Sequence, residues 1–212
     1  MTHPRYRWFL APAVAAGTLA AAVAACAAAG GSPPAATPRG AIPAKGVQQE
    51  PVGGTARTAA AKLASFDDPK LTGTVTFTQE TGAVRVVVDL AGVTKPGPHG
   101  LHLHEVGKCE SDPGGKNYTT AGGHFNPTGA AHACPDSTAH HAGDFGNIEI
   151  QADGSGHYER LTAMLSLSGP SSPVGRALIL HAGADDCTTQ PTGNSGGRLA
   201  CGVVVATSGV AH

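Results

Sequence analysis

The residues best suited to chemistry in this sequence are histidines, because six of its 11 histidines fall at spacings that suit metal binding. His102 and His104 alternate with Leu101 and Leu103. In a β-strand, residues two apart share a face, so both imidazoles would lie on one side and both leucines would point into the core. The pattern predicts a two-histidine platform for a metal ion, although two histidines on a strand are weak evidence by themselves.

A second group of candidate ligands falls within 21 residues of a glycine-rich segment. Its members are His124, His132, His141 and Asp144. Three imidazoles and one carboxylate suit tetrahedral Zn²⁺, a borderline ion that accepts nitrogen and oxygen ligands. His181 follows the apolar run 177–180 and would emerge at the loop end of a strand, where it can meet the histidine pair.

These side chains must be positioned by β-structure. From about Arg57 onward, runs rich in Val and Thr alternate with Gly, Pro and Asp, and no segment keeps a helical period. Strands are predicted at residues 58–65, 72–79, 83–90, 99–105, 145–151, 156–162, 176–182 and 199–206. Thr81-Gly82 and Asp153-Gly154 suit tight hairpin turns. The predicted fold is all-β, an eight-stranded antiparallel Greek-key β-barrel or sandwich.

Two predicted connections, residues 107–144 and 183–198, are much longer than a hairpin requires. Long loops in a compact domain are usually functional when they are ordered. Nearly all of the candidate ligands lie in these two loops or at their ends, so we expect both loops to be functional.

The N-terminal residues 1–25 read as a secretory signal, with two early arginines followed by an apolar, alanine-rich run. The run ends in Val23-Ala24-Ala25-Cys26, which resembles a bacterial lipobox. This predicts an exported protein of the cell envelope or periplasm, attached to a membrane through lipid on Cys26. Two alternatives are a signal cleaved elsewhere among the alanines and an uncleaved span, for which about 17 apolar residues is short.

Residues 26–56 are rich in Ala, Gly, Pro and Ser, with few large apolar side chains to offset the loss of chain entropy on folding. We predict a flexible tether there, followed by one domain at 57–212. Without residues 1–25 the chain carries 12 basic and 15 acidic side chains. This balance predicts no basic patch for nucleic acid.

Five cysteines in an exported protein would leave one thiol without a partner. If Cys26 carries lipid, the remaining four are Cys109, Cys134, Cys187 and Cys201. An oxidising compartment permits two disulfides among them.

Four segments of the chain resemble the signatures of the Cu,Zn superoxide dismutases. They are residues 100–105 (GLHLHE), 122–127 (GGHFNP), 141–147 (HAGDFGN) and 197–203 (GRLACGV). The resemblance covers roughly residues 57–207, in the order found in the family. It implies a bacterial, exported member of this family whose cofactors are copper and zinc.

The resemblance also implies a ligand set for each metal. The copper ligands would be His102, His104, His124 and His181. The zinc ligands would be His124, His132, His141 and Asp144, so that His124 bridges the two ions. Asp185 matches the carboxylate that links a copper-site histidine to a zinc-site histidine and fixes their orientation.

Other histidines are given no metal by this assignment. The nine-residue interval from His132 favours His141 over its neighbour His140, which we expect to be solvated. His99, His157 and His212 are expected to be ordinary exposed or turn residues.

The activity that the resemblance implies is dismutation of superoxide to dioxygen and hydrogen peroxide by copper redox cycling. His124 would act catalytically by taking up and releasing a proton. Arg198 matches the arginine of the family that attracts and orients the anion. The loop 183–198 contains no lysine, so steering of superoxide would depend more heavily on Arg198.

The family disulfide corresponds to Cys109 and Cys201. A second bond between Cys134 and Cys187, joining the two long loops, is our hypothesis; the alternative is two unpaired thiols. Two other functions compete with the enzyme: a copper-storing lipoprotein and a copper-only relative. The presence of Arg198 and of the bridging His124 argues against the first, and the intact set of His132, His141 and Asp144 argues against the second. The sequence leaves open a homodimer or a monomer.

Overall fold

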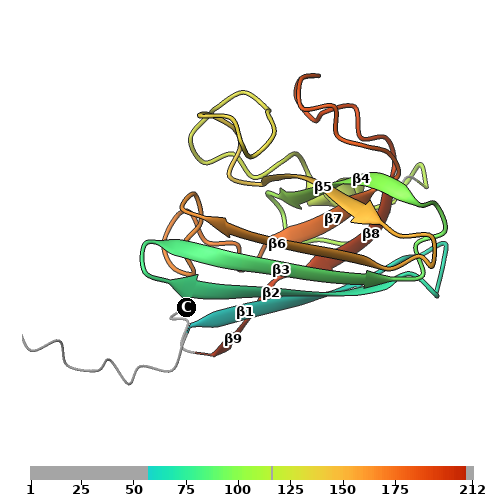
Figure 1. Cartoon of the computed structure of the whole chain (residues 1–212), viewed down its shortest axis with the longest axis horizontal. Helices are drawn as coiled ribbons and strands as arrows, with labels where there is room; N and C mark the ends of the chain where they lie inside the picture. The colour runs from blue at the N-terminus through green and yellow to red at the C-terminus, as the bar shows by residue number, and fades with distance from the viewer. Residues whose placement is uncertain (1–56, 116, 209–212) are drawn as a thin grey trace, which may run out of the picture. The chain divides into compact units, whose positions relative to one another are not determined.

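The computed structural model describes residues 57–115 and 117–208, and its strands form one closed antiparallel barrel (Figure 1). The predicted signal, lipobox and tether, and also His212, lie outside the described residues. The strands are β1 (Thr58–Ala64), β2 (Thr72–Glu80), β3 (Ala83–Ala91), β4 (Gly97–His104), β5 (Asp144–Ile150), β6 (Gly156–Thr162), β7 (Ala177–His181), β8 (Arg198–Val203) and β9 (Val205–Ser208). One short 3₁₀ helix, η1 (Thr119–Ala121), lies in the connection between β4 and β5.

Alternating apolar side chains explain why the strands form and which face they bury. In β3, Val84, Val86, Val88 and Leu90 are buried, while Asp89 is exposed. β-branched residues fit a pleated surface with one buried face, and every second side chain points to that face. Such side chains build one large core, beside which a smaller apolar cluster includes Ile179 and Cys201. In β4 and β7 the alternation is lost, because both faces of these strands are buried.

The strand order is β2-β3-β6-β5-β4-β7-β8-β1-β9, and an additional β1–β2 pairing closes the barrel. Figure 1 shows β1, β2, β3 and β6 as one wall and β4, β5, β7 and β8 as the other. The walls meet through narrow pairings, Ile150 with Gly156 at one corner and Ala64 with Cys201 at the other. The predicted antiparallel Greek-key barrel is therefore confirmed.

The last predicted strand, 199–206, is divided into β8 and β9 at Val204. The backbone of Val204 turns aside to pair with the segment before β7, since its N–H donates to the Arg176 carbonyl and its own carbonyl accepts from Gly175. After this interruption β9 pairs with β1 instead of continuing along β7.

The two long connections, β4 to β5 and β7 to β8, rise on the same side of the barrel in Figure 1. Hydrogen bonds join them directly, because the Gln190 side chain bonds both backbone groups of His132. Among the described residues, no helix is long and apolar enough to cross a membrane.

Candidate metal centre

The first cluster of histidines is built on the central strands of the second wall. His102 and His104 lie on β4, which pairs in antiparallel register with β7, the strand that ends at His181. His124 joins them through an isolated bridge between its backbone and that of His104. All four side chains are buried, and one ring nitrogen from each lies within 4.8 Å of the others. The structure thus brings together all four predicted copper ligands.

The second cluster shares His124 with the first. Ligand atoms of His124, His132, His141 and Asp144 also lie within 4.8 Å of one another. Asp144, the first residue of β5, accepts hydrogen bonds from His124 Nδ1 at 2.7 Å and from His141 Nδ1 at 3.2 Å. The backbone N–H groups of Ala133 and His141 donate to its other oxygen. All four predicted zinc ligands are therefore brought together as well.

Asp185 lies between the two clusters and bonds one histidine of each. Its Oδ2 accepts from His102 Nε2 and its Oδ1 from His132 Nε2, each at 2.9 Å. The carboxylate is held in place by the backbone N–H of Cys187, and the Asp185 backbone bonds the Asn147 side chain. Gly193 approaches so closely that a Cβ there would collide with the carboxylate. Asp185 thus fixes the orientation of two imidazoles at once.

Three buried ring nitrogens in these clusters make no hydrogen bond of good geometry among the described residues: His102 Nδ1, His124 Nε2 and His132 Nδ1. His132 Nδ1 nevertheless lies 3.0 Å from Asp144 Oδ1, so His102 Nδ1 and His124 Nε2 are the clear cases. In each ring the other nitrogen is bonded to a carboxylate, which leaves the unpartnered nitrogen to present its lone pair. A buried polar atom without a partner is unfavourable unless something binds it. The donor atoms fit copper and zinc, which both accept imidazole nitrogen.

The protonation states of most of the ligands favour metal binding. His132 is the exception: burial alone would lower its pKa, but the hydrogen bond to Asp185 and the charge of Asp144 outweigh burial and raise the pKa. Burial lowers the pKa of His102 and of His104 well below the usual value, and it lowers the pKa of His181 to about 3. Burial alone would raise the pKa of Asp144, but hydrogen bonding to His124 and the nearby histidines outweigh it and lower the pKa to about 2. Neutral imidazoles and an ionised carboxylate are the forms that bind metal ions.

Arg198, the first residue of β8, lies beside the first cluster. Its Nη1 donates to the Tyr118 carbonyl and its Nη2 to the Gly122 carbonyl, each at 2.6 Å. Burial lowers the pKa of Arg198, but a guanidinium remains charged at all physiological pH values. Its positive charge contributes to the lowered pKa of His104 and of His181. The side chain lines a pocket of about 470 Å³.

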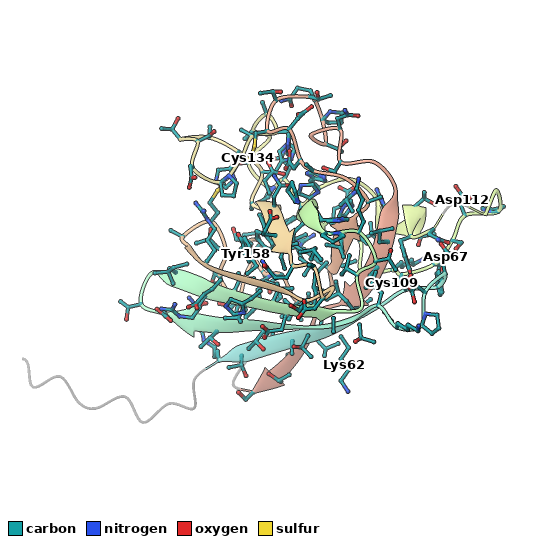
Figure 2. All side chains as sticks on the ribbon, turned by 45° about the vertical axis from the view of Figure 1, so that its right-hand side comes forward. Lys62, Asp67, Cys109, Asp112, Cys134 and Tyr158 are labelled. Atoms are coloured by element: carbon teal, nitrogen blue, oxygen red, sulfur yellow. A yellow bond between two sulfur atoms is a disulfide. The ribbon has the colours of Figure 1, made fainter. Side chains whose placement is uncertain are left out.

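Both predicted disulfide pairs are present in the structure. Cys109 is bonded to Cys201 in β8, with the Cα atoms 5.6 Å apart. Cys134 is bonded to Cys187, with the Cα atoms 4.7 Å apart, and this bond joins the two long loops. In Figure 2, Cys134 lies in the loop region at the top of the view, whereas Cys109 lies lower, towards Asp67.

Two expectations about the other histidines were wrong. His140 is buried instead of solvated, and its Nδ1 bonds the carbonyl of His141. His99 is 1% exposed, with Nδ1 at 2.7 Å from the His181 carbonyl and Nε2 at 2.9 Å from the Lys95 carbonyl. His99 has the strand parity of Leu101, so the alternation that placed the leucines in the core applied to it too. His157 is exposed, as expected, and pairs with Asp89.

Two residues that the sequence reasoning did not select also reach the site. Gln190 bonds the backbone of His132, and Tyr118 supplies a carbonyl to Arg198. Both contacts join positions more than 50 residues apart, and no local pattern in the sequence signals them.

A closed antiparallel barrel that carries two adjacent ligand sets with a shared imidazole defines a metalloprotein with a dinuclear centre. Residues 71–204 match the family model described as copper/zinc superoxide dismutase (SODC). The chain belongs to the copper/zinc superoxide dismutase family. It is accordingly an oxidoreductase that dismutes superoxide, with copper and zinc as cofactors.

A curated relative and a solved structure are also similar to this chain. The chain is 42% identical over 142 residues to a protein of Deinococcus radiodurans named superoxide dismutase [Cu-Zn], a match that covers 63% of this chain and 77% of the relative. A solved structure described as the clock protein EA4 is similar with a TM-score of 0.63 and 36% identity, covering 72% of this chain and 96% of that one.

Proposed function

We propose that dismutation takes place at the two histidine clusters of this chain, with a defined ligand set for each metal. Copper would be held by His102, His104, His124 and His181. Zinc would be held by His124, His132, His141 and Asp144. The observation that carries the proposal is the pair of buried, unpartnered ring nitrogens, His102 Nδ1 and His124 Nε2, each opposite a nitrogen bonded to a carboxylate.

Copper, when bound, supplies a one-electron couple that takes an electron from one superoxide and returns it to a second, whereas zinc has no redox chemistry. The reaction consumes two superoxide anions and two protons and yields dioxygen and hydrogen peroxide. A proton carrier is therefore required near copper. His124 suits this role because its Nδ1 faces Asp144 while its Nε2 is free on the side of the copper set. Nε2 would take up a proton in one half-reaction and release it in the other.

Arg198 would attract superoxide and orient it. Two of its five N–H donors are bonded to backbone carbonyls, which leaves others for a small anion. The pocket beside it is lined by Asp67, Asn117, Thr119, Gly196, Gly197 and Leu199. None of these is basic, so among the described residues that line the pocket the guanidinium is the one cation.

The ligand assignment predicts that the purified protein, loaded with excess copper and zinc and then dialysed, retains about one ion of each. Removing both ions with a chelator should lower the midpoint of thermal unfolding by ~5 °C or more, because metals that bind only the folded state stabilise it. Elemental analysis and calorimetry measure both effects. Copper retained without zinc would instead point to a copper-only protein.

We also propose that the chain is exported and anchored by lipid on Cys26, with the tether 26–56 joining the anchor to the domain. Two disulfides support an oxidising compartment, which agrees with export. The wild-type protein is expected in the detergent phase of a detergent–water partition and Cys26→Ser in the aqueous phase. Mass spectrometry of a mature protein that begins at a residue other than Cys26 would contradict the lipid anchor.

A further inference from the structure

The orientation of Arg198 depends on the backbone around η1. The two carbonyls that accept from its guanidinium, those of Tyr118 and Gly122, lie immediately before and after this helix. Tyr118 has a left-handed backbone, with φ 58° and ψ 17°. This region is disfavoured for a bulky side chain and persists only where the surroundings impose it. The Tyr118 carbonyl also accepts from the Ala121 N–H at 3.1 Å within η1, and contacts of the Tyr118 side chain hold the left-handed residue that carries this carbonyl.

Those contacts come from the end of β1. The Tyr118 hydroxyl accepts from the Phe66 backbone N–H at 2.7 Å and donates to the Ala64 carbonyl at 3.1 Å. The ring stacks on Phe66 with 4.8 Å between centroids and packs in a small apolar cluster that includes Cys201. The side chain is 1% exposed. The Tyr118 side chain is thus held by the segment at the end of β1, more than 50 residues away in sequence.

We propose that Tyr118 is a positioning residue for the anion-binding arginine. Its hydroxyl is held by the backbone of Ala64 and Phe66, and this contact fixes the Tyr118 carbonyl that orients the Arg198 guanidinium. The inference rests on the proposed role of Arg198. It goes further in assigning part of the anion affinity to a residue that touches neither the metals nor the substrate. Loss of the hydroxyl would leave the metal ligands in place while the guanidinium loses one of its two fixed supports.

The test is Tyr118→Phe, which keeps the ring and removes only the hydroxyl. The readout is the dissociation constant of azide, a small anion, measured by the absorption change of the copper- and zinc-loaded protein. We expect azide to bind about two- to tenfold more weakly, the range that corresponds to one lost hydrogen bond. KM for superoxide should rise more than kcat falls, while copper content and the copper EPR spectrum stay unchanged.

The chain offers a matched control in Tyr158→Phe. The Tyr158 hydroxyl is also buried but has no hydrogen-bond partner in the described part of the chain, so its removal should leave azide affinity unchanged. If Tyr118→Phe does not fold, Phe66→Ala removes the stacked ring from a 59% exposed position while keeping the backbone N–H, and it should weaken azide binding in the same direction. Unchanged azide affinity in a folded variant overturns the proposal.

A double-mutant cycle separates positioning from a general structural effect. In the Arg198→Ala background, Tyr118→Phe should have no further effect on azide affinity, because the arginine that it positions is gone. An equal loss in both backgrounds overturns the proposal. If the wild-type protein binds copper and azide but does not remove superoxide, the proposed function fails while the cycle still decides the role of Tyr118.

Discussion

Replacing His124 with alanine is expected to lower superoxide removal by at least about a hundredfold, the lower end of what a positioned proton carrier contributes. The effect should exceed that of any other single ligand, because one ring belongs to both clusters. The substitution removes a nitrogen from each metal site and also removes the proton carrier at Nε2. Superoxide decay followed by stopped flow, normalised to the copper content of each sample, measures the loss.

The control for this substitution is His157→Ala. His157 is exposed and pairs with Asp89 on the neighbouring strand, away from the metal ligands, so its loss should leave both metal content and activity unchanged. Elemental analysis of His124→Ala should show weakened retention of zinc as well as copper. Activity per copper within a fewfold of the wild type would remove His124 from the catalytic role.

Replacing Arg198 with alanine is expected to lower kcat/KM for superoxide by about ten- to a hundredfold, within the range attributed to electrostatic steering. Of the described residues that line the adjacent pocket, Arg198 alone is a cation, and the loop before it contains no lysine. The dependence of kcat/KM on ionic strength should become weaker, because a steering charge has been removed. Steady-state kinetics at two salt concentrations measure both effects.

Two companion variants make this result specific. Arg198→Lys should recover only part of the loss, because an ammonium keeps the charge but lacks the forked donors that use two carbonyls at once. Arg57→Ala removes a positive charge from an exposed site that bonds Ser168, and it should leave kcat/KM unchanged. An Arg198→Ala enzyme with unaltered kcat/KM and salt dependence would contradict the proposed anion guide.

Much of the fold could be predicted from the sequence, because the alternation of apolar and polar side chains along a strand indicates which face is buried. The strands from β1 to β7 begin and end within about two residues of their predicted positions. The break at Val204 could not be predicted, because it arises where the Val204 backbone N–H and carbonyl pair with residues 175 and 176, which are distant in sequence. A local pattern carries no information about such a partner.

The ligand sets could be predicted for a different reason. Metal binding requires particular side-chain types, and these cluster in the sequence. Asp185 apart, residues that support the site leave no such mark. Tyr118 contributes a carbonyl, which every residue possesses, and its left-handed backbone lies beside contacts of its side chain with the end of β1. His99 could have been placed in the core from its strand parity, but its two carbonyl partners could not have been identified.

The most direct test of the account is superoxide decay in the presence of the purified full-length protein loaded with copper and zinc. The account predicts catalysed decay that is first order in enzyme, with one hydrogen peroxide formed for every two superoxide anions consumed. It predicts that the activity is lost when the metals are removed and returns when both are restored. Stoichiometric binding of copper and zinc without accelerated decay would contradict it and would favour a metal-storing protein.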